Sequence, residues 1–248
     1  MKILSIGNSF SEDAHGYLCD VFKSVGEDTY VVNACVPGCS LQMHWDYLEN
    51  NTPVYMLQEN GVTTKTEVVF KDIITAQKWD VITIQQVSHF SGKYETYQPF
   101  LENLYRELKA LCPDAKYYIH KTWAYESDFV SPNFENYNSD QKYMYECVTD
   151  ANNKAAQSID ADIIPAGDVI QYLRENTKEF DYKNGGLSFN RDGFHLTLDY
   201  GRYTATLTWC CKILGVDAFD VKFTPEVCND EKLVNIIKNA VNTVLKGE

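Results

Sequence analysis

Short apolar segments alternate along this chain with longer stretches in which apolar residues recur every three or four positions. Five apolar runs predict buried strands at residues 2–6, 30–34, 80–85, 115–120 and 162–165. The amphipathic stretches predict helices at residues 14–25, 40–48, 71–77, 94–111, 139–158, 166–175, 197–213 and 230–245. Strands that alternate with helices are typical of a three-layer α/β/α sandwich, so we predict that fold class with a five-stranded, mostly parallel sheet.

Two segments depart from this alternation. Residues 53–70 read as two strand-like runs around Asn60-Gly61, a dipeptide typical of tight hairpin turns. We therefore predict a small inserted β-hairpin within a single domain that spans residues 1–248. Residues 121–139 are rich in aromatic residues, Ser, Asn and Pro, which is typical of a long functional loop.

Composition excludes several classes of partner. The net charge of −13 argues against nucleic acid, and no apolar run approaches the roughly 18 residues that a membrane-spanning helix needs. The eight cysteines show no metal-binding spacing, so we expect reduced thiols in the core. Because the chain starts with a strand and not with a signal-peptide pattern, we expect a cytoplasmic protein, unless a leader has been removed.

The end of the first strand carries the first candidate for chemistry. The run breaks into Gly7-Asn8-Ser9, which places a hydroxyl on a tight turn at the carboxyl edge of the sheet. A serine there becomes a nucleophile when a base activates it. The alternative is structural, because Ser9-Phe10-Ser11-Glu12 also matches a helix capping box.

The far end of the chain supplies a candidate base. Asp192 and His195 lie three residues apart, so one short loop can present an imidazole and the carboxylate that orients it. The same pattern also caps helices, and here a helix is predicted to begin near Thr197. The order serine, aspartate, histidine is more specific than either motif alone.

These motifs resemble a known family. Gly7-Asn8-Ser9-Phe10-Ser11 resembles the first sequence block of the SGNH (GDSL-type) hydrolases, and Asp192-Gly193-Phe194-His195-Leu196 resembles the last block. Gly38 stands where the family carries its second-block glycine. The resemblance implies a flavodoxin-like fold over residues 2 to 213, with Ser9 as nucleophile, His195 as base and Asp192 as its orienting acid. It also implies an oxyanion hole that includes the backbone N–H groups of Ser9 and Gly38, and no cofactor.

The third block departs from the family pattern. Most members have Gly-x-Asn there and use the Asn side chain in the oxyanion hole, whereas this chain has Gln85 and Gln86. A glutamine amide can replace that donor, and strand alternation allows only one of the two to reach the site. We predict Gln85, because Ile84 to Ser88 aligns with the Leu-Gln-Glu-x-Ser of variant relatives. The alternative is a buried amide that bonds loop backbone.

All five histidines follow predicted strands, which suggests a histidine-bearing rim at the carboxyl edge of the sheet. From this placement we expect the substrate pocket to be lined by His44, Trp45, His89, His120, Trp123 and Tyr125. Simple aromatic packing is the alternative. A metal site built from His44, His89 and His120 finds no support in their spacing, so we predict no metal.

Together these patterns predict a serine esterase that works through an acyl-enzyme. The expected substrate is a small-molecule or carbohydrate ester that carries a small acyl group, acetyl in the simplest case. Two alternatives stay open. One is a non-catalytic ligand-binding protein on the same scaffold, because the third block has drifted, and the other is an acyltransferase that uses the same triad.

Overall fold

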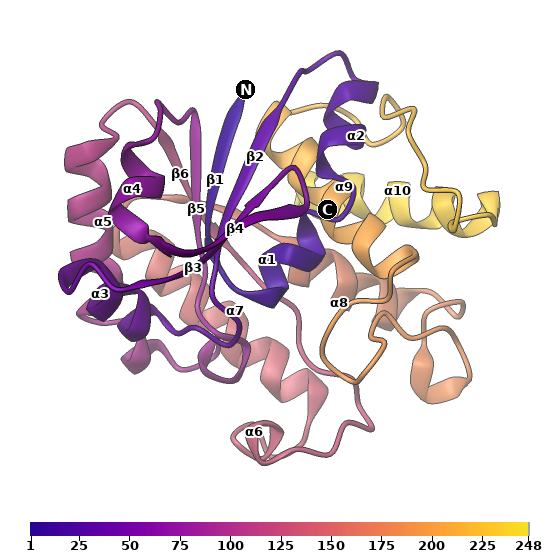
Figure 1. Cartoon of the computed structure of the whole chain (residues 1–248). Coiled ribbons are helices and arrows are strands. Elements are labelled where there is room, and N and C mark those ends of the chain that lie inside the picture. Colours follow the sequence, from indigo (N-terminus) through magenta and orange to yellow (C-terminus); the bar gives the residue numbers. More distant parts are fainter. Residues whose placement is uncertain (248) are drawn as a thin grey trace.

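A computed structural model describes residues 1–247 and contains one mixed β-sheet with helices packed on both faces (Figure 1). The strand order is β4-β3-β2-β1-β5-β6-β7. Five of these strands pair in parallel: β1 (Lys2–Gly7), β2 (Tyr30–Cys35), β5 (Val81–Ile84), β6 (Lys116–His120) and β7 (Asp162–Ile164). All five lie where apolar runs predict them.

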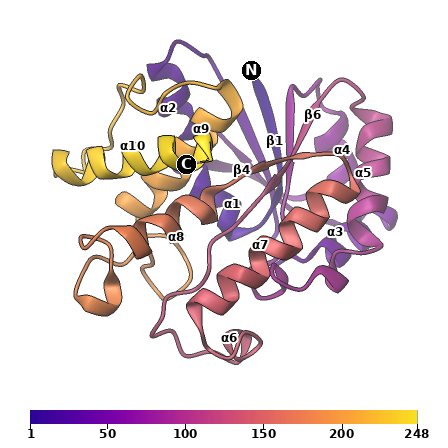
Figure 2. The same cartoon turned by 180° about the vertical axis from the view of Figure 1, so that it is seen from behind.

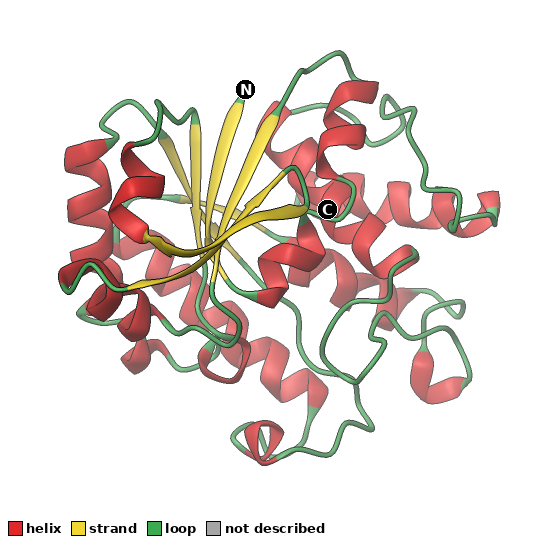
Figure 3. Ribbon diagram, viewed as in Figure 1, coloured by secondary structure: helices red, strands yellow, loops and turns green. Residues whose placement is uncertain are grey.

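The predicted hairpin is present, but it does not stand apart from the sheet. Strand β3 (Pro53–Glu59) pairs antiparallel with β2, and β4 (Val62–Val69) pairs antiparallel with β3. The sheet therefore has seven strands and not five, which corrects the predicted strand number (Figure 3). The physical reason is that β2 would otherwise expose its backbone N–H and C=O groups as an edge, and the hairpin pairs with that edge.

Each face of the sheet has its own apolar core, as expected for strands whose side chains alternate between faces. Ile3 packs in one core, while Leu4 and Ile6 pack in the other. The helices of the first face are α1 (Ser9–Ala14), α2 (Leu18–Ser24), α8 (Ala166–Asn176), α9 (Tyr200–Leu214) and α10 (Glu231–Lys246). Those of the second face are α3 (Leu41–Glu49), α4 (Phe70–Thr75) and α5 (Phe100–Leu111).

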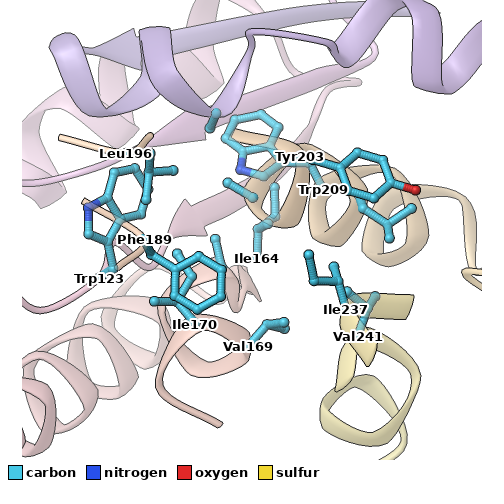
Figure 4. Packing of buried hydrophobic residues seen from close by; sticks show 14 of the residues in the cluster. Trp123, Ile164, Val169, Ile170, Phe189, Leu196, Tyr203, Trp209, Ile237 and Val241 are labelled. Carbon is cyan, nitrogen blue, oxygen red and sulfur yellow. The ribbon is translucent and has the colours of Figure 1, made fainter. Parts of the chain in front are cut away.

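The long helix α7 (Gln141–Ser158) crosses between the two groups of helices (Figure 2). It contributes Met144 and Val148 to the first core and Ala155 to the second. In the first core, side chains from β7, α8, α9 and α10 meet around Trp209 and Ile237 (Figure 4). This packing holds the end of β7 and the start of α9 in place, and the loop before α9 carries Asp192 and His195.

Several helix boundaries differ from the predicted ones. The predicted helix at 14–25 is two helices, α1 and α2, with a turn at residues 15–17. The predicted helix at 94–111 is a short 3₁₀ turn at Tyr94–Thr96 followed by α5, which begins directly after Pro99. Proline lacks an N–H donor and cannot continue a helix, so α5 starts there. Residues 121–139 form an extended loop with one short helix, α6 (Pro132–Glu135).

Within residues 1–247, all eight cysteines are free thiols, six of them buried. Over the same range, none of the helices combines the length and the apolar character needed to cross a bilayer.

Candidate active site

Ser9 is the first residue of α1, directly after the turn that ends β1. The residue that caps the helix is Asn8, whose side-chain oxygen accepts from the Phe10 N–H at 3.0 Å. The capping-box alternative for Ser9 therefore does not hold. Its hydroxyl instead lies 2.9 Å from Nε2 of His195.

His195 and Asp192 lie on the loop that precedes α9, and one side chain orients the other. Nδ1 of His195 is 2.7 Å from Oδ2 of Asp192. The second oxygen of Asp192 accepts from the backbone N–H groups of His195, at 2.8 Å, and Phe194, at 3.2 Å. Partial burial raises the pKa of Asp192, but these hydrogen bonds outweigh burial, and the net pKa lies below the usual value.

An ionised Asp192 decides which ring nitrogen of His195 carries the proton. A carboxylate only accepts, so Nδ1 is the protonated nitrogen and Nε2 presents a lone pair. That lone pair faces the Ser9 hydroxyl, which donates to it. The three residues thus form one continuous hydrogen-bonded series from the Ser9 hydroxyl through the imidazole to the carboxylate.

The turn after β2 brings a backbone donor to the same place. Residues 36–39 form a β-turn closed by the Cys39 N–H to the Val36 carbonyl at 3.1 Å. Gly38 occupies its third position with φ of +67°, which a side chain would strain. Within residues 1–247, neither Gly38 nor Ser9 has an acceptor for its backbone N–H, and both residues line the same cavity. Both N–H groups are therefore free to donate to a molecule in the cavity.

Gln85 does not reach the cavity, which corrects the prediction that its amide is a direct oxyanion donor. Its Nε2 donates to Oδ1 of Asn8 at 2.8 Å, and its Oε1 lies 2.6 Å from Nδ1 of His120. The Asn8 amide in turn donates to the Cys39 carbonyl at 3.2 Å. Gln85 is thus committed to the turn that carries Ser9, and through Asn8 it is linked to the turn that carries Gly38.

The direction of this chain of hydrogen bonds is fixed. The Phe10 N–H can only donate, so the Asn8 atom that it meets is the oxygen. The Gln85 atom on that same oxygen is therefore the nitrogen, and its oxygen faces His120. His120 consequently carries its proton on Nδ1.

Gln86 points to the opposite face of the sheet, as strand alternation predicts. Its oxygen accepts from the N–H groups of Leu41 and Val87, each at 2.9 Å, and its nitrogen donates to the Thr96 carbonyl at 3.0 Å. This is the alternative role of a buried amide that bonds loop backbone. Gln86 does not line the cavity either.

Four of the residues expected in the pocket pack elsewhere. His44 is fully buried and bonds the Tyr55 hydroxyl at 2.7 Å, and its neighbour Trp45 packs against the second core. His120 lies against Trp209 beneath the site, and Trp123 stacks on Phe10 with its indole N–H on the Phe194 carbonyl at 2.7 Å. Placement after a strand does not decide which way a side chain points, and these four point into the cores. His89 and Tyr125 do line the cavity.

The cavity beside Ser9 has a volume of about 430 Å³. Its lining comes from the ends of β1, β2 and β5, the loop at 121–139 and the loop before α9: Asn8, Ser9, Phe10, Pro37, Gly38, Val87, Ser88, His89, Tyr125, Phe129, Ser131, Asn133, Phe194 and His195. The cavity lies where the chain reverses its direction across the sheet, between β1 and β5, which is the usual ligand site of such folds.

Sequence reasoning missed several of these lining residues, although some of them stand inside recognised motifs. Phe10 follows Ser9, Phe194 precedes His195, and Ser88 belongs to the third block. Phe129 belongs to the aromatic loop that we expected to be functional, and its ring fills the space where Gly193 lacks a side chain. Proximity to a motif is therefore a signal for Phe10, Phe194 and Ser88, and the aromatic composition of the loop is the signal for Phe129.

Asp13 is a further residue of the site region, and no sequence motif points to it. It is fully buried on α1 and accepts from Arg191 at 3.0 Å, from Nε of Arg202 at 2.9 Å and from the Leu196 N–H at 2.8 Å. The helix that begins with Ser9 is therefore tied to the residues on either side of the Asp192–His195 pair. The partners of Asp13 lie about 180 positions away in the sequence, so a local sequence pattern cannot predict these contacts.

The histidines do not assemble a metal site. His44 and His120 are buried with separate partners, and His89 lies at the cavity. Among residues 1–247 there is no group of three or more His, Cys, Asp or Glu side chains placed to hold a metal ion.

Solved structures with this architecture place the chain in a structural class. A protein from Slackia heliotrinireducens that is proposed to be an SGNH hydrolase is 21% identical with a TM-score of 0.59, over 86% of this chain and 98% of that one. An acetylxylan esterase from Geobacillus stearothermophilus is 13% identical with a TM-score of 0.54, over 90% and 94% of the two chains. The fold is therefore that of the SGNH hydrolases, as the motifs predict.

A family model identifies the family of this chain within that structural class. The family model described as "Domain of unknown function (DUF4886)" matches residues 2–244, so the chain belongs to that family. A DUF4886 family protein from Bacteroides uniformis has a TM-score of 0.90 at 32% identity, over 99% of this chain and 95% of that one. A comparison with curated proteins gives no match.

Proposed function

We propose that this protein is a serine esterase that removes a small acyl group, such as acetyl, from a carbohydrate or a small metabolite. The observation that carries the proposal is the series Ser9 to His195 to Asp192, with contacts of 2.9 Å and 2.7 Å at the edge of a cavity. Support also comes from the backbone N–H groups of Ser9 and Gly38, which are unpaired within the described part of the chain and belong to two residues that line the same cavity. The similarity to the fold of an acetylxylan esterase agrees with an ester substrate, but it does not identify the acyl group.

The reaction follows from this arrangement in two halves. Oγ of Ser9 attacks the ester carbonyl while Nε2 of His195 takes the hydroxyl proton, and the N–H groups of Ser9 and Gly38 stabilise the charge on the carbonyl oxygen. The carbon–oxygen bond to the alcohol then breaks, and His195 passes its proton to the departing oxygen. Water attacks the acyl-enzyme in the same way, which releases the acid and restores Ser9.

The direct test combines covalent labelling with turnover. We expect a fluorophosphonate probe to modify Ser9, identified by mass spectrometry, and p-nitrophenyl acetate to be hydrolysed. Ser9→Ala is expected to abolish labelling and to lower turnover by several powers of ten, because the nucleophile is removed. Ser24→Ala is the matched control, since Ser24 bonds only the Val21 carbonyl at the end of α2 and should leave both readouts unchanged.

The same experiment addresses the binding-protein and acyltransferase alternatives. A protein that only binds its ligand leaves the probe unreacted and the ester intact. A transferase reacts with the probe but turns over faster with an added alcohol than with water alone. Labelled Ser9 together with hydrolysis that does not depend on an added acceptor supports the esterase.

A further inference from the structure

Four aromatic rings surround one side of the proposed nucleophile. The Phe194 ring centroid lies 3.9 Å from that of His195. Around Phe194 stand Phe129 at 5.4 Å, Tyr125 at 5.9 Å and Phe10 at 6.3 Å, again between ring centroids. All four line the cavity, and we call them the aromatic wall.

The position of this wall decides which half of an ester would meet it. In the proposed reaction His195 passes its proton to the departing alcohol oxygen, so the alcohol stands beside the imidazole. The aromatic wall lies on that side, because Phe194 and Phe10 both pack against the His195 ring. The acyl group lies across the scissile bond from it.

The electrostatics of the cavity restrict the charge of that alcohol. Apart from two histidines and one tyrosine, none of the fourteen lining residues is ionisable, so a carboxylate or phosphate on the substrate would meet no lysine or arginine in the lining. Burial and nearby Lys93 lower the pKa of His89, and burial raises that of Tyr125 to about 12, so both groups are neutral at pH 7. The net charge of −13 further repels an anion.

Hydrogen-bonding groups interrupt the aromatic surface. The hydroxyls of Ser88 and Tyr125 bond each other at 2.8 Å, and the side chains of Ser131 and Asn133 belong to the loop at the cavity. Flat aromatic faces beside hydroxyl and amide groups suit a ring that has apolar C–H faces and polar edges. An alkyl chain would make no hydrogen bonds to these polar groups.

We propose that the aromatic wall is the alcohol subsite and that the leaving alcohol is an uncharged sugar ring. This inference rests on the proposed esterase function and specifies its substrate class. It assigns Phe129 and Phe194 to recognition of the leaving group and not of the acyl group.

The test compares esters that share the acetyl group and differ only in the alcohol. Mono-O-acetyl glucose, mono-O-acetyl glucuronate and ethyl acetate are assayed with the wild type, with Phe129→Leu and with Phe219→Leu. Leucine keeps apolar volume at position 129 but removes the flat face. Phe219 is an exposed phenylalanine that does not line the cavity, so it is the matched control.

We expect the wild type to prefer acetyl glucose to acetyl glucuronate. Phe129→Leu should lower kcat/KM for acetyl glucose about 2- to 12-fold more than for ethyl acetate, mainly through KM, since this is the range of one aromatic contact. Phe219→Leu should change none of the ratios. Equal losses on both esters, a preference for the glucuronate, or a loss that grows with acyl length instead of with the alcohol would each overturn the inference.

A binding measurement separates failure of this inference from failure of the esterase proposal. Methyl glucoside is titrated into Ser9→Ala, and aromatic NMR signals of the wall are followed. Fluorophosphonate labelling of Ser9 without any effect of methyl glucoside overturns the sugar assignment alone. Absence of both labelling and hydrolysis overturns the esterase proposal, and the alcohol subsite with it.

Discussion

The smallest scale at which this protein can be understood is the pair of hydrogen bonds that join Asp192, His195 and Ser9. Asp192→Asn keeps the shape of the side chain but can donate to Nδ1, so it favours the ring form with its proton on Nε2. That form cannot accept the Ser9 proton. We expect kcat for p-nitrophenyl acetate to fall about 10⁴-fold at neutral pH with little change in KM. Asp114→Asn, at an exposed site, is the control, and activity of Asp192→Asn within tenfold of wild type would contradict the assigned role.

Gln85 gives a second residue-scale prediction, and its readouts distinguish two roles. If it positions Asn8, Gln85→Ala leaves the buried Nδ1–H of His120 without its acceptor. We then expect the free energy of unfolding to fall by about 1–3 kcal/mol, measured in urea. Turnover should fall less than the roughly 100- to 1,000-fold that follows the loss of a direct oxyanion donor. Unchanged stability with a loss in that larger range would restore Gln85 to the oxyanion hole.

The contrast between these residues shows what the sequence could reveal about the site. Asp192 and His195 could be predicted because their interaction spans three residues and depends on local spacing. The face on which Gln85 lies could also be predicted, from strand alternation. Its partners could not, because they depend on which side-chain rotamer meets Asn8 and His120 across three separate segments.

At the scale of elements, the buried carboxylate of Asp13 ties α1 to the loop before α9. Asp13→Asn removes the negative charge that Arg191 and Arg202 share. Because these arginines are 35% and 23% exposed, solvent compensates part of the loss, and the cost should stay below the roughly 3–5 kcal/mol of a fully buried pair. Because Leu196 also bonds Asp13, the backbone beside His195 should shift. We expect lower stability and, in the folded variant, a lower kcat with a nearly unchanged KM.

The control for this prediction is Asp20→Asn, an exposed carboxylate on the neighbouring helix α2. The positioning role also has a readout that stability alone would not change. The rate of fluorophosphonate labelling, measured well below the unfolding temperature, should fall with Asp13→Asn. A labelling rate equal to wild type in a destabilised variant would leave Asp13 with a structural role only.

Elements were predictable where their signals are local. Helix α3 begins after Ser40, as predicted, because that side chain accepts from the Met43 N–H at 3.3 Å. The predicted start of α5 is too early, because the helical spacing of apolar residues continues through the 3₁₀ turn that precedes Pro99. The pairing of β3 with β2 could not be predicted, since it depends on an edge formed by residues more than twenty positions away.

At the scale of the whole molecule, three fully buried histidines link folding to pH. Burial lowers the pKa of His15, His44 and His120 to about 3, from an ordinary value of 6.5. Above pH 6.5 the three are neutral in both folded and unfolded chains. Below it the unfolded chain binds protons that the folded chain does not, so stability falls as the pH decreases toward 3. Each histidine contributes a slope of about 1.4 kcal/mol per pH unit, or about 4 for all three.

We therefore expect urea unfolding between pH 4 and 8 to show a nearly level free energy from these groups above pH 6.5 and a steep loss below. His44→Gln should reduce the slope below pH 6 by about one third of the histidine contribution, because glutamine can still bond the Tyr55 hydroxyl but does not titrate. His89→Gln, at a half-buried position, should reduce it less. A slope that His44→Gln leaves unchanged would show that the acid sensitivity comes from the carboxylates instead, whose native pKa values then lie well below those of the unfolded chain.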